Sequence, residues 1–193
     1  MFGPHGVTSP AGTAPADGGG GMDVVLGIDP GLTRCGYAVL GVVPGRPPKP
    51  LSMGVIRTPA TDPLPERLGL LHREIAALIA EFKPSSVAIE QVFFQNNVRT
   101  AMSVGQASGV VIALAANSGC TVAQYTPSQV KDTVAGWGGA DKAQVQRMVQ
   151  QRLGLSSLPK PADAADAAAI ALCHCAIAPF VALRDAALAR GRS

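Results

Sequence analysis

The sequence predicts one α/β domain in which a five-stranded mixed sheet is flanked by helices. Three strand-like segments come first, and helices then alternate with two further strands, an order typical of such a sheet. The chain has 193 residues, of which 47% are hydrophobic, enough for an ordinary core. Its net charge of +3 is too weak an excess to require a polyanionic partner by itself.

The chain is organised around a hairpin in which Pro30 and Gly31 join two apolar, β-branched runs. The first run, 24–28, is apolar almost throughout, as expected of a central strand buried on both faces. Asp29 ends this run, where a buried carboxylate is costly unless a cation or donors satisfy it. Taken alone, Asp29 could equally cap the turn through its own backbone.

A third strand over 51–58 completes an antiparallel meander. Apolar residues at three- and four-residue steps then predict an amphipathic helix over 64–82. The short apolar strand 86–90 follows and again ends in an acid, Glu90.

The second half of the chain alternates helices with one more strand. The expected elements are a loop over 91–97, a helix over 98–117, a strand over 120–124, a helix that starts at Thr126 and carries Lys131, a helix over 141–153 with Lys142, and a last helix over 162–178. Small residues in the helix 98–117 permit close approach either to the chain's own elements or to another copy of it.

Phe93 and Phe94 stand together in the loop that follows Glu90. Because aromatic residues make up only 4% of the chain, two of them on a polar loop are unusual. We expect one to pack inward and one to face outward, where a ring beside acids could stack on an unpaired base.

Residues 1–21 are rich in Gly, Pro, Ala and Ser, and we expect them to be disordered and dispensable. The expected domain therefore covers 22–182, with a basic C-terminal tail at 183–193. No signal peptide is recognisable and the four cysteines have no secretory context, which predicts a cytoplasmic protein with reduced thiols. The segment 173–175, Cys-His-Cys, favours ordinary thiols over a zinc site, because a helix would spread the three residues around its axis.

Asp163 and Asp166 lie three residues apart in the first turn of the last helix, and therefore on one face. Acids at a helix start can simply complement its dipole. Here alanines surround them, so both carboxylates are expected to face inward, where like charges repel unless a metal lies between them.

The ends of the first and fourth strands can be neighbours in a mixed sheet, and the last helix could bring its acids to the same place. Four carboxylates with no matching His or Cys cluster favour a hard cation, Mg²⁺ or Mn²⁺. Two such ions per site can activate a water and stabilise the leaving oxygen in phosphodiester hydrolysis.

Three segments resemble the signature segments of the bacterial RuvC family of Holliday junction resolvases: 27–31 (Gly-Ile-Asp-Pro-Gly), 88–93 (Ala-Ile-Glu-Gln-Val-Phe) and 162–167 (Ala-Asp-Ala-Ala-Asp-Ala). The resemblance covers nearly all of the chain from Met22 onward. It implies a ribonuclease-H-like fold and a homodimer that cuts four-way DNA junctions by paired symmetric nicks in recombination and repair. It also implies contact with a branch-migration motor complex.

Carried over residue by residue, the resemblance assigns Asp29, Glu90, Asp163 and Asp166 as catalytic, metal-binding acids. Phe93 matches an aromatic residue that stacks on a base at the junction centre. Lys131 and Lys142 match basic residues that hold or activate the DNA backbone.

Three other functions remain open at this point. The segment 28–33 also resembles the first phosphate loop of the actin and sugar-kinase superfamily, although those phosphotransferases need two such domains. A different ribonuclease-H-like nuclease acting on RNA or RNA–DNA hybrids would carry similar acids. A junction-binding protein without catalysis is the third, and the presence of all four acids argues against it.

Overall fold

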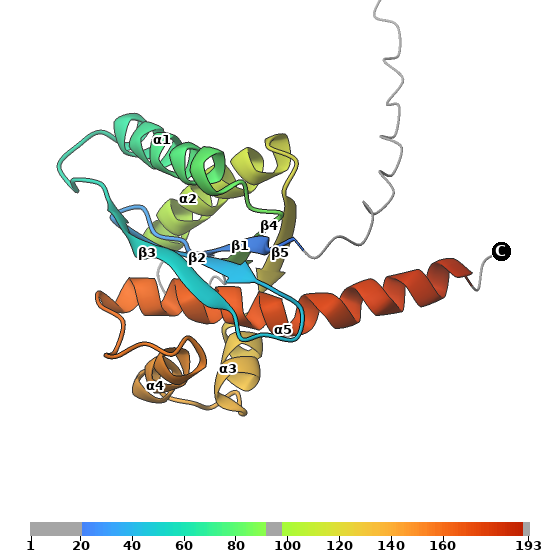
Figure 1. Ribbon diagram of the computed structural model, residues 1–193. Coiled ribbons are helices and arrows are strands. Elements are labelled where there is room, and N and C mark those ends of the chain that lie inside the picture. The colour runs from blue at the N-terminus through green and yellow to red at the C-terminus, as the bar shows by residue number, and fades with distance from the viewer. Residues whose placement is uncertain (1–20, 92–97, 191–193) are drawn as a thin grey trace, which may run out of the picture.

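The structure is a computed structural model that describes residues 21–91 and 98–190. Its five strands form one sheet in the order β3-β2-β1-β4-β5 (Figure 1). β1 pairs with β2, and β2 with β3, in antiparallel fashion, whereas β1–β4 and β4–β5 are parallel. The five-stranded mixed sheet predicted from the sequence is therefore confirmed. The strands are β1 (Asp23–Asp29), β2 (Arg34–Val42), β3 (Lys49–Arg57), β4 (Ser86–Glu90) and β5 (Thr121–Tyr125).

The helices agree closely with the predicted segments except at the C-terminal end. They are α1 (Leu64–Phe82), α2 (Val98–Asn117), α3 (Pro127–Ala135), α4 (Lys142–Arg152) and α5 (Ala162–Arg190). The prediction that the last helix ends at residue 178 was wrong, because α5 continues through Pro179 to Arg190. A proline removes one backbone hydrogen bond but does not have to end a helix, and the Ala- and Leu-rich sequence beyond it favours continuation.

Capping residues fix where α3 and α4 begin. Thr126 Oγ1 accepts a hydrogen bond from the backbone N–H of Gln129, whose side chain accepts one in return from the N–H of Thr126. Asp141 and Gln144 repeat this capping box at the start of α4. Lys131 and Lys142, which these helices carry, are positioned by local signals that the sequence already contains.

Helices cover both faces of the sheet (Figure 1). On one face α1 and α2 pack over β-sheet residues such as Leu26, Ile28 and Ile89. On the other face α5 lies along the strands, with α3 and α4 outside it, over residues such as Val25 and Ala88. The central strand β1 is thus buried on both sides, as its apolar sequence predicts.

Two glycines let α5 lie directly on the sheet. A Cβ atom on Gly27 of β1 would collide with the carbonyl oxygen of Ala167 and lie 2.7 Å from Ala171 Cβ. A Cβ atom on Gly36 of β2 would collide with the carbonyl oxygen of Asp163. The contact between the first turns of α5 and the sheet therefore depends on residues without side chains.

The final part of α5 extends beyond the body of the molecule (Figure 1). The sequence predicts no membrane span, because no uninterrupted apolar run in it approaches the roughly 20 residues needed to cross a bilayer. By length and composition alone, α5 nevertheless passes the test for such a span. Its residues 164, 165 and 167–174 are buried against the sheet and α3, which is the position of a core helix, and such helices pass the same test.

Candidate active site

A pocket of about 300 Å³ lies where β1 and β4 end, next to α3, α4 and α5. Because β1 and β4 are parallel neighbours, their final residues, Asp29 and Glu90, are brought to the same edge of the sheet. Residues of α3, α4 and α5 complete the lining of the pocket. The lining residues are Asp29, Glu90, Pro127, Val130, Lys131, Lys142, Val145, Asp166, Ala169 and Ile170.

Asp29 is the most perturbed acid of this pocket. Burial and then the negative charges of Glu90, Asp166 and Asp163 raise the pKa of Asp29 to about 7 from an ordinary value of 3.8. Burial, followed by the charge of Asp166, also raises the pKa of Glu90. Both carboxylates therefore hold their charge at a cost that a nearby cation would relieve.

Asp163 and Asp166 both contact basic side chains. The ammonium of Lys142 donates a hydrogen bond to Asp166 Oδ2 over 2.6 Å. Arg34, the first residue of β2, donates from Nε to Asp163 Oδ2 over 3.0 Å, and its Nη2 donates to the same oxygen. This contact with Arg34 lowers the pKa of Asp163.

The structure places the predicted site residues unequally. Asp29, Glu90 and Asp166 line one pocket together with Lys131 and Lys142, whereas Asp163 is not among the lining residues. Phe93 lies outside the described residues.

The chemistry of this donor set fits a hard cation. The acids supply only oxygen ligands, and burial together with their mutual repulsion raises the pKa of Asp29. Within residues 21–91 and 98–190, however, no three His, Cys, Asp or Glu side chains are grouped closely enough to hold one ion. The partners of Asp163 and Asp166 are basic side chains, so a full ligand set requires some of these carboxylates to turn.

Arg34 is the residue of this site that the sequence analysis did not select. Its only sequence signal is a basic residue at the start of a strand, just after the turn that follows Asp29. The acid it contacts lies 129 residues away along the chain, which no local pattern predicts.

The Cys-His-Cys segment has a packing role in the structure. The Nδ1 atom of His174 is hydrogen-bonded to the hydroxyl of Tyr125 over 2.9 Å, which joins α5 to the end of β5. The Cys173 thiol donates to the carbonyl oxygen of Gln129 and the hydroxyl of Thr133 on α3. These contacts fix α3 and β5 against α5, just beyond the acids.

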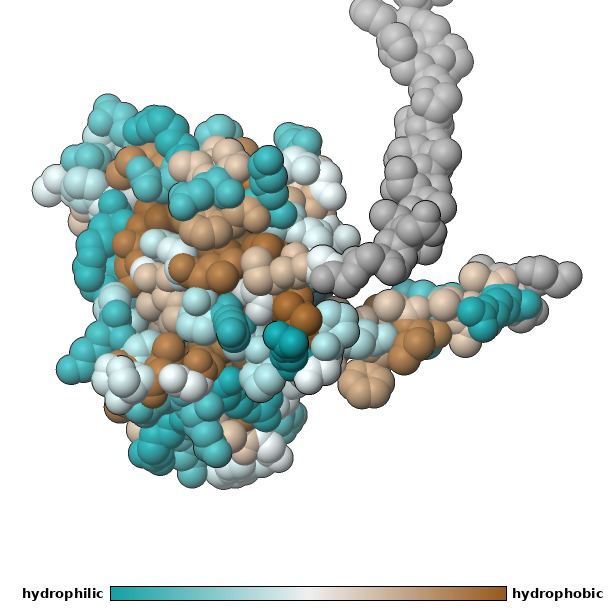
Figure 2. Space-filling model, in the orientation of Figure 1, coloured by the Kyte–Doolittle hydropathy of each residue, from teal (hydrophilic) through white to brown (hydrophobic). Residues whose placement is uncertain are grey.

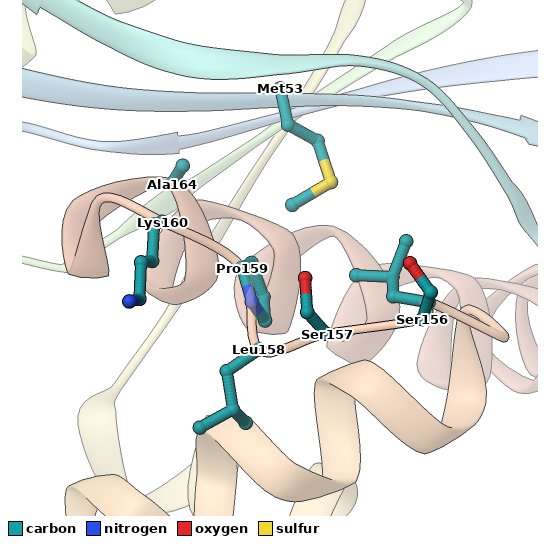
Figure 3. A pocket seen from close by; sticks show the side chains of 8 residues that line it. Met53, Ser156, Ser157, Leu158, Pro159, Lys160 and Ala164 are labelled. Atoms are coloured by element: carbon teal, nitrogen blue, oxygen red, sulfur yellow. The ribbon is translucent and has the colours of Figure 1, made fainter.

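A second, larger groove of about 630 Å³ lies between β3, the loop 155–160 and the first turn of α5 (Figure 3). Met53 of β3 points toward the loop 155–160 across it, and Ala164 of α5 forms part of its wall. None of the four acids lines this groove. Size alone would therefore select a cavity without these acids, because three of them meet in the smaller one.

Comparison with known proteins identifies the family. Residues 25–174 match the family model described as crossover junction endodeoxyribonuclease RuvC. A crossover junction endodeoxyribonuclease RuvC of Salinispora arenicola is 55% identical over 150 residues, which cover 78% of this chain and 86% of that protein.

Two solved structures from Thermus thermophilus have the same fold. Its RuvC is 39% identical with a TM-score of 0.76, covering 81% of this chain and 96% of that one. The same protein in complex with a Holliday junction substrate is 40% identical with a TM-score of 0.75, covering 79% and 92% of the two chains. The sheet order, the position of the acids and these similarities together show that this chain belongs to the RuvC family of crossover junction endodeoxyribonucleases.

Proposed function

We propose that this chain is a structure-specific endonuclease that resolves four-way (Holliday) DNA junctions in recombination and repair. The observation that carries the proposal is the meeting of Asp29, Glu90 and Asp166 with Lys131 and Lys142 at one pocket, in a chain of this family. Acids beside lysines suit a phosphodiester, because the former can hold cations and the latter can contact phosphate oxygens.

The four acids would hold the metal. Enzymes of this family are generally metal-dependent, and we propose two ions, Mg²⁺ or Mn²⁺, held by Asp29, Glu90, Asp166 and Asp163. When bound, such ions lower the pKa of a water and stabilise the leaving oxygen. The backbone of the acids is fixed by β1, β4 and the glycine-packed start of α5, so rotation of the side chains is what would bring their oxygens to a metal ion.

Lys131 and Lys142 would position the DNA strand. Lys142 lies 2.6 Å from Asp166 Oδ2 and Lys131 lines the same pocket, so a phosphate that enters meets a positive charge on both α3 and α4. We propose that Phe93, next to Glu90 in sequence, stacks on a base at the junction centre.

A homodimer would match the two-fold symmetry of the junction, since two equal sites can then cut equivalent strands. We propose the outward face of α2 as its interface. One face of this helix packs on the body through Ala107, Val111 and Ala115. On the other, Met102 is 57% exposed and a Cβ on Gly105 would meet no atom within 4 Å.

The remaining expectations rest on the composition of the chain and on the family resemblance. They comprise a nuclease domain over residues 22–182, flanked by an N-terminal extension over 1–21 and a basic tail over 183–193. They also include a cytoplasmic location and contact with a branch-migration motor complex.

Cleavage of a labelled synthetic four-way junction tests the function. We expect paired, symmetric nicks with Mg²⁺ or Mn²⁺ and none with EDTA. Asp29→Asn should abolish cleavage but keep junction binding, because affinity comes mainly from the basic surface. A linear duplex and an RNA–DNA hybrid of equal length are the matched substrates. Preferential cutting of the hybrid, or unchanged cleavage by Asp29→Asn, would contradict the proposal.

A further inference from the structure

Arg34 connects the start of β2 to the first turn of α5 through a carboxylate of the candidate site. Its Nε and Nη2 atoms both donate to Asp163 Oδ2. We propose that Arg34 is a positioning residue that holds the Asp163 carboxylate outside the metal pocket, so that a divalent cation must displace it to recruit this ligand. This inference rests on the proposed function, because it takes Asp163 as a metal ligand.

The pocket lining supports this assignment. Asp29, Glu90 and Asp166 contribute to the wall of the pocket, whereas Asp163 does not.

The backbone at Asp163 leaves rotation of the side chain as the way to move the carboxylate. Gly36 of β2 lies so close to the carbonyl group of Asp163 that even a methyl group between them would collide with it. The start of α5 therefore cannot move toward the sheet. Since the helix is fixed there, the partner of the carboxylate decides which way the carboxylate turns, and that partner is Arg34.

The strength of the contact suits a ligand that is exchanged. The side chain of Arg34 is 39% exposed and that of Asp163 is 24% exposed, so water screens the pair. Ion pairs between partly exposed side chains stabilise a protein only modestly. Breaking the Arg34–Asp163 pair should therefore change the affinity for a cation roughly 3- to 10-fold, and the intact pair does not prevent binding. Arg34 would thus set the divalent-ion concentration at which the site fills.

Arg57 provides a matched control. It faces Arg34 directly in the register of β2 and β3, and it is exposed. No salt bridge to it is found within the part of the chain that the structure describes. Replacing either arginine by Gln removes one positive charge from the same edge of the sheet, but only Arg34→Gln frees Asp163.

The test is Mn²⁺ binding to the full-length protein, measured by calorimetry without DNA. We expect Arg34→Gln to bind Mn²⁺ about 3- to 10-fold more tightly than the unmodified protein. Arg57→Gln should leave the affinity within about 2-fold. Arg34→Lys, which keeps the charge but has one donating nitrogen in place of two, should have an affinity between these values. Equal or weaker binding by both Arg34 variants would overturn the proposal, and circular dichroism checks that each is folded.

A double variant separates positioning from a general charge effect. If Arg34 acts through Asp163, Arg34→Gln should have no further effect in an Asp163→Asn background. A gain that persists there would show that Arg34 acts as a distant charge and would overturn the proposal. Junction cleavage by the unmodified protein is measured in parallel, so failure of the nuclease function is distinguished from failure of this inference.

Discussion

The two halves of α5 have similar alanine-rich sequences and opposite surroundings. Residues 164–174, apart from the half-buried Asp166, are buried between the sheet and α3, whereas residues 179–190 are exposed. In the second half Phe180 is 73% exposed and Leu183 is 68% exposed, and apolar surface is visible on the projecting segment (Figure 2). The family match ends at residue 174, close to where burial ends.

The difference shows that composition does not decide the role of this helix. Alanine favours a helix in both halves. In the first half it also allows close approach to Gly27 and Gly36, and this approach brings Asp163 and Asp166 to the strand ends. Within the described residues, the contact found for Asp185 in the second half is an exposed one with the neighbouring Arg184. The surroundings of an acid on α5 thus depend on which elements pack against its part of the helix.

Replacing one acid in each half gives the largest expected contrast. Asp166→Asn should lower the rate of junction cleavage on the order of 10³-fold, since a bound metal ion that loses this ligand no longer lowers the activation barrier by several kcal/mol. Asp185→Asn, the same change on the same helix, should leave the rate unchanged. Single-turnover cleavage of a four-way junction measures both. Similar rates for the two variants would remove Asp166 from the site.

Filling the contact between β1 and α5 should have the next largest effect, on stability. Gly27→Ala places a methyl group against the Ala167 carbonyl and should destabilise the fold by about 3 kcal/mol. Gly69→Ala on α1 is the control, because its Cβ would lie 3.6 Å from the nearest atom, the end of the flexible Arg73 side chain. It should stabilise the protein by about 0.5–1 kcal/mol. Urea denaturation compares them, and equal effects would refute tight packing at Gly27.

The pH dependence of stability should reveal the acids that face the first half of α5. The pKa of Asp29 is raised to about 7, above its unfolded value, so the folded protein binds more protons between about pH 4 and 7. The contribution of Asp29 to stability is therefore greatest below about pH 4 and is lost as the pH rises through 7.

Asp29→Asn removes this penalty in metal-free protein. In EDTA it should be more stable than the unmodified protein by roughly 4 kcal/mol at pH 8, and the gain should vanish near pH 4. Asp185→Asn should show no such trend, since its carboxylate is largely exposed. Urea denaturation at several pH values measures this, and a gain independent of pH would contradict the raised pKa.

Removal of the tail 183–193 should have the smallest effect. The described residues of this segment are exposed, so deletion should change the free energy of unfolding by less than about 1 kcal/mol and leave the cleavage rate intact. A large loss of either would mean that the projecting half of α5 has a partner that the body of the molecule needs.

Local signals in the sequence determined most of the fold. The apolar run of β1, the capping residues Thr126 and Asp141, and the periodic apolar face of α1 act over a few residues and need no distant partner. The acids Asp29 and Glu90 could be placed at a common edge because parallel neighbouring strands end together.

Tertiary structure alone decided which of the four acids line the pocket and which one contacts an arginine instead. Asp29, Glu90 and Asp166 line a pocket while Asp163 turns to Arg34, a partner 129 residues away, and the larger groove lies elsewhere. Tertiary structure also decided where α5 leaves the hydrophobic core, because the helix is longer than the part of it that the sheet covers. Local sequence sets which elements form, whereas side-chain partners depend on distances that exist only after those elements pack.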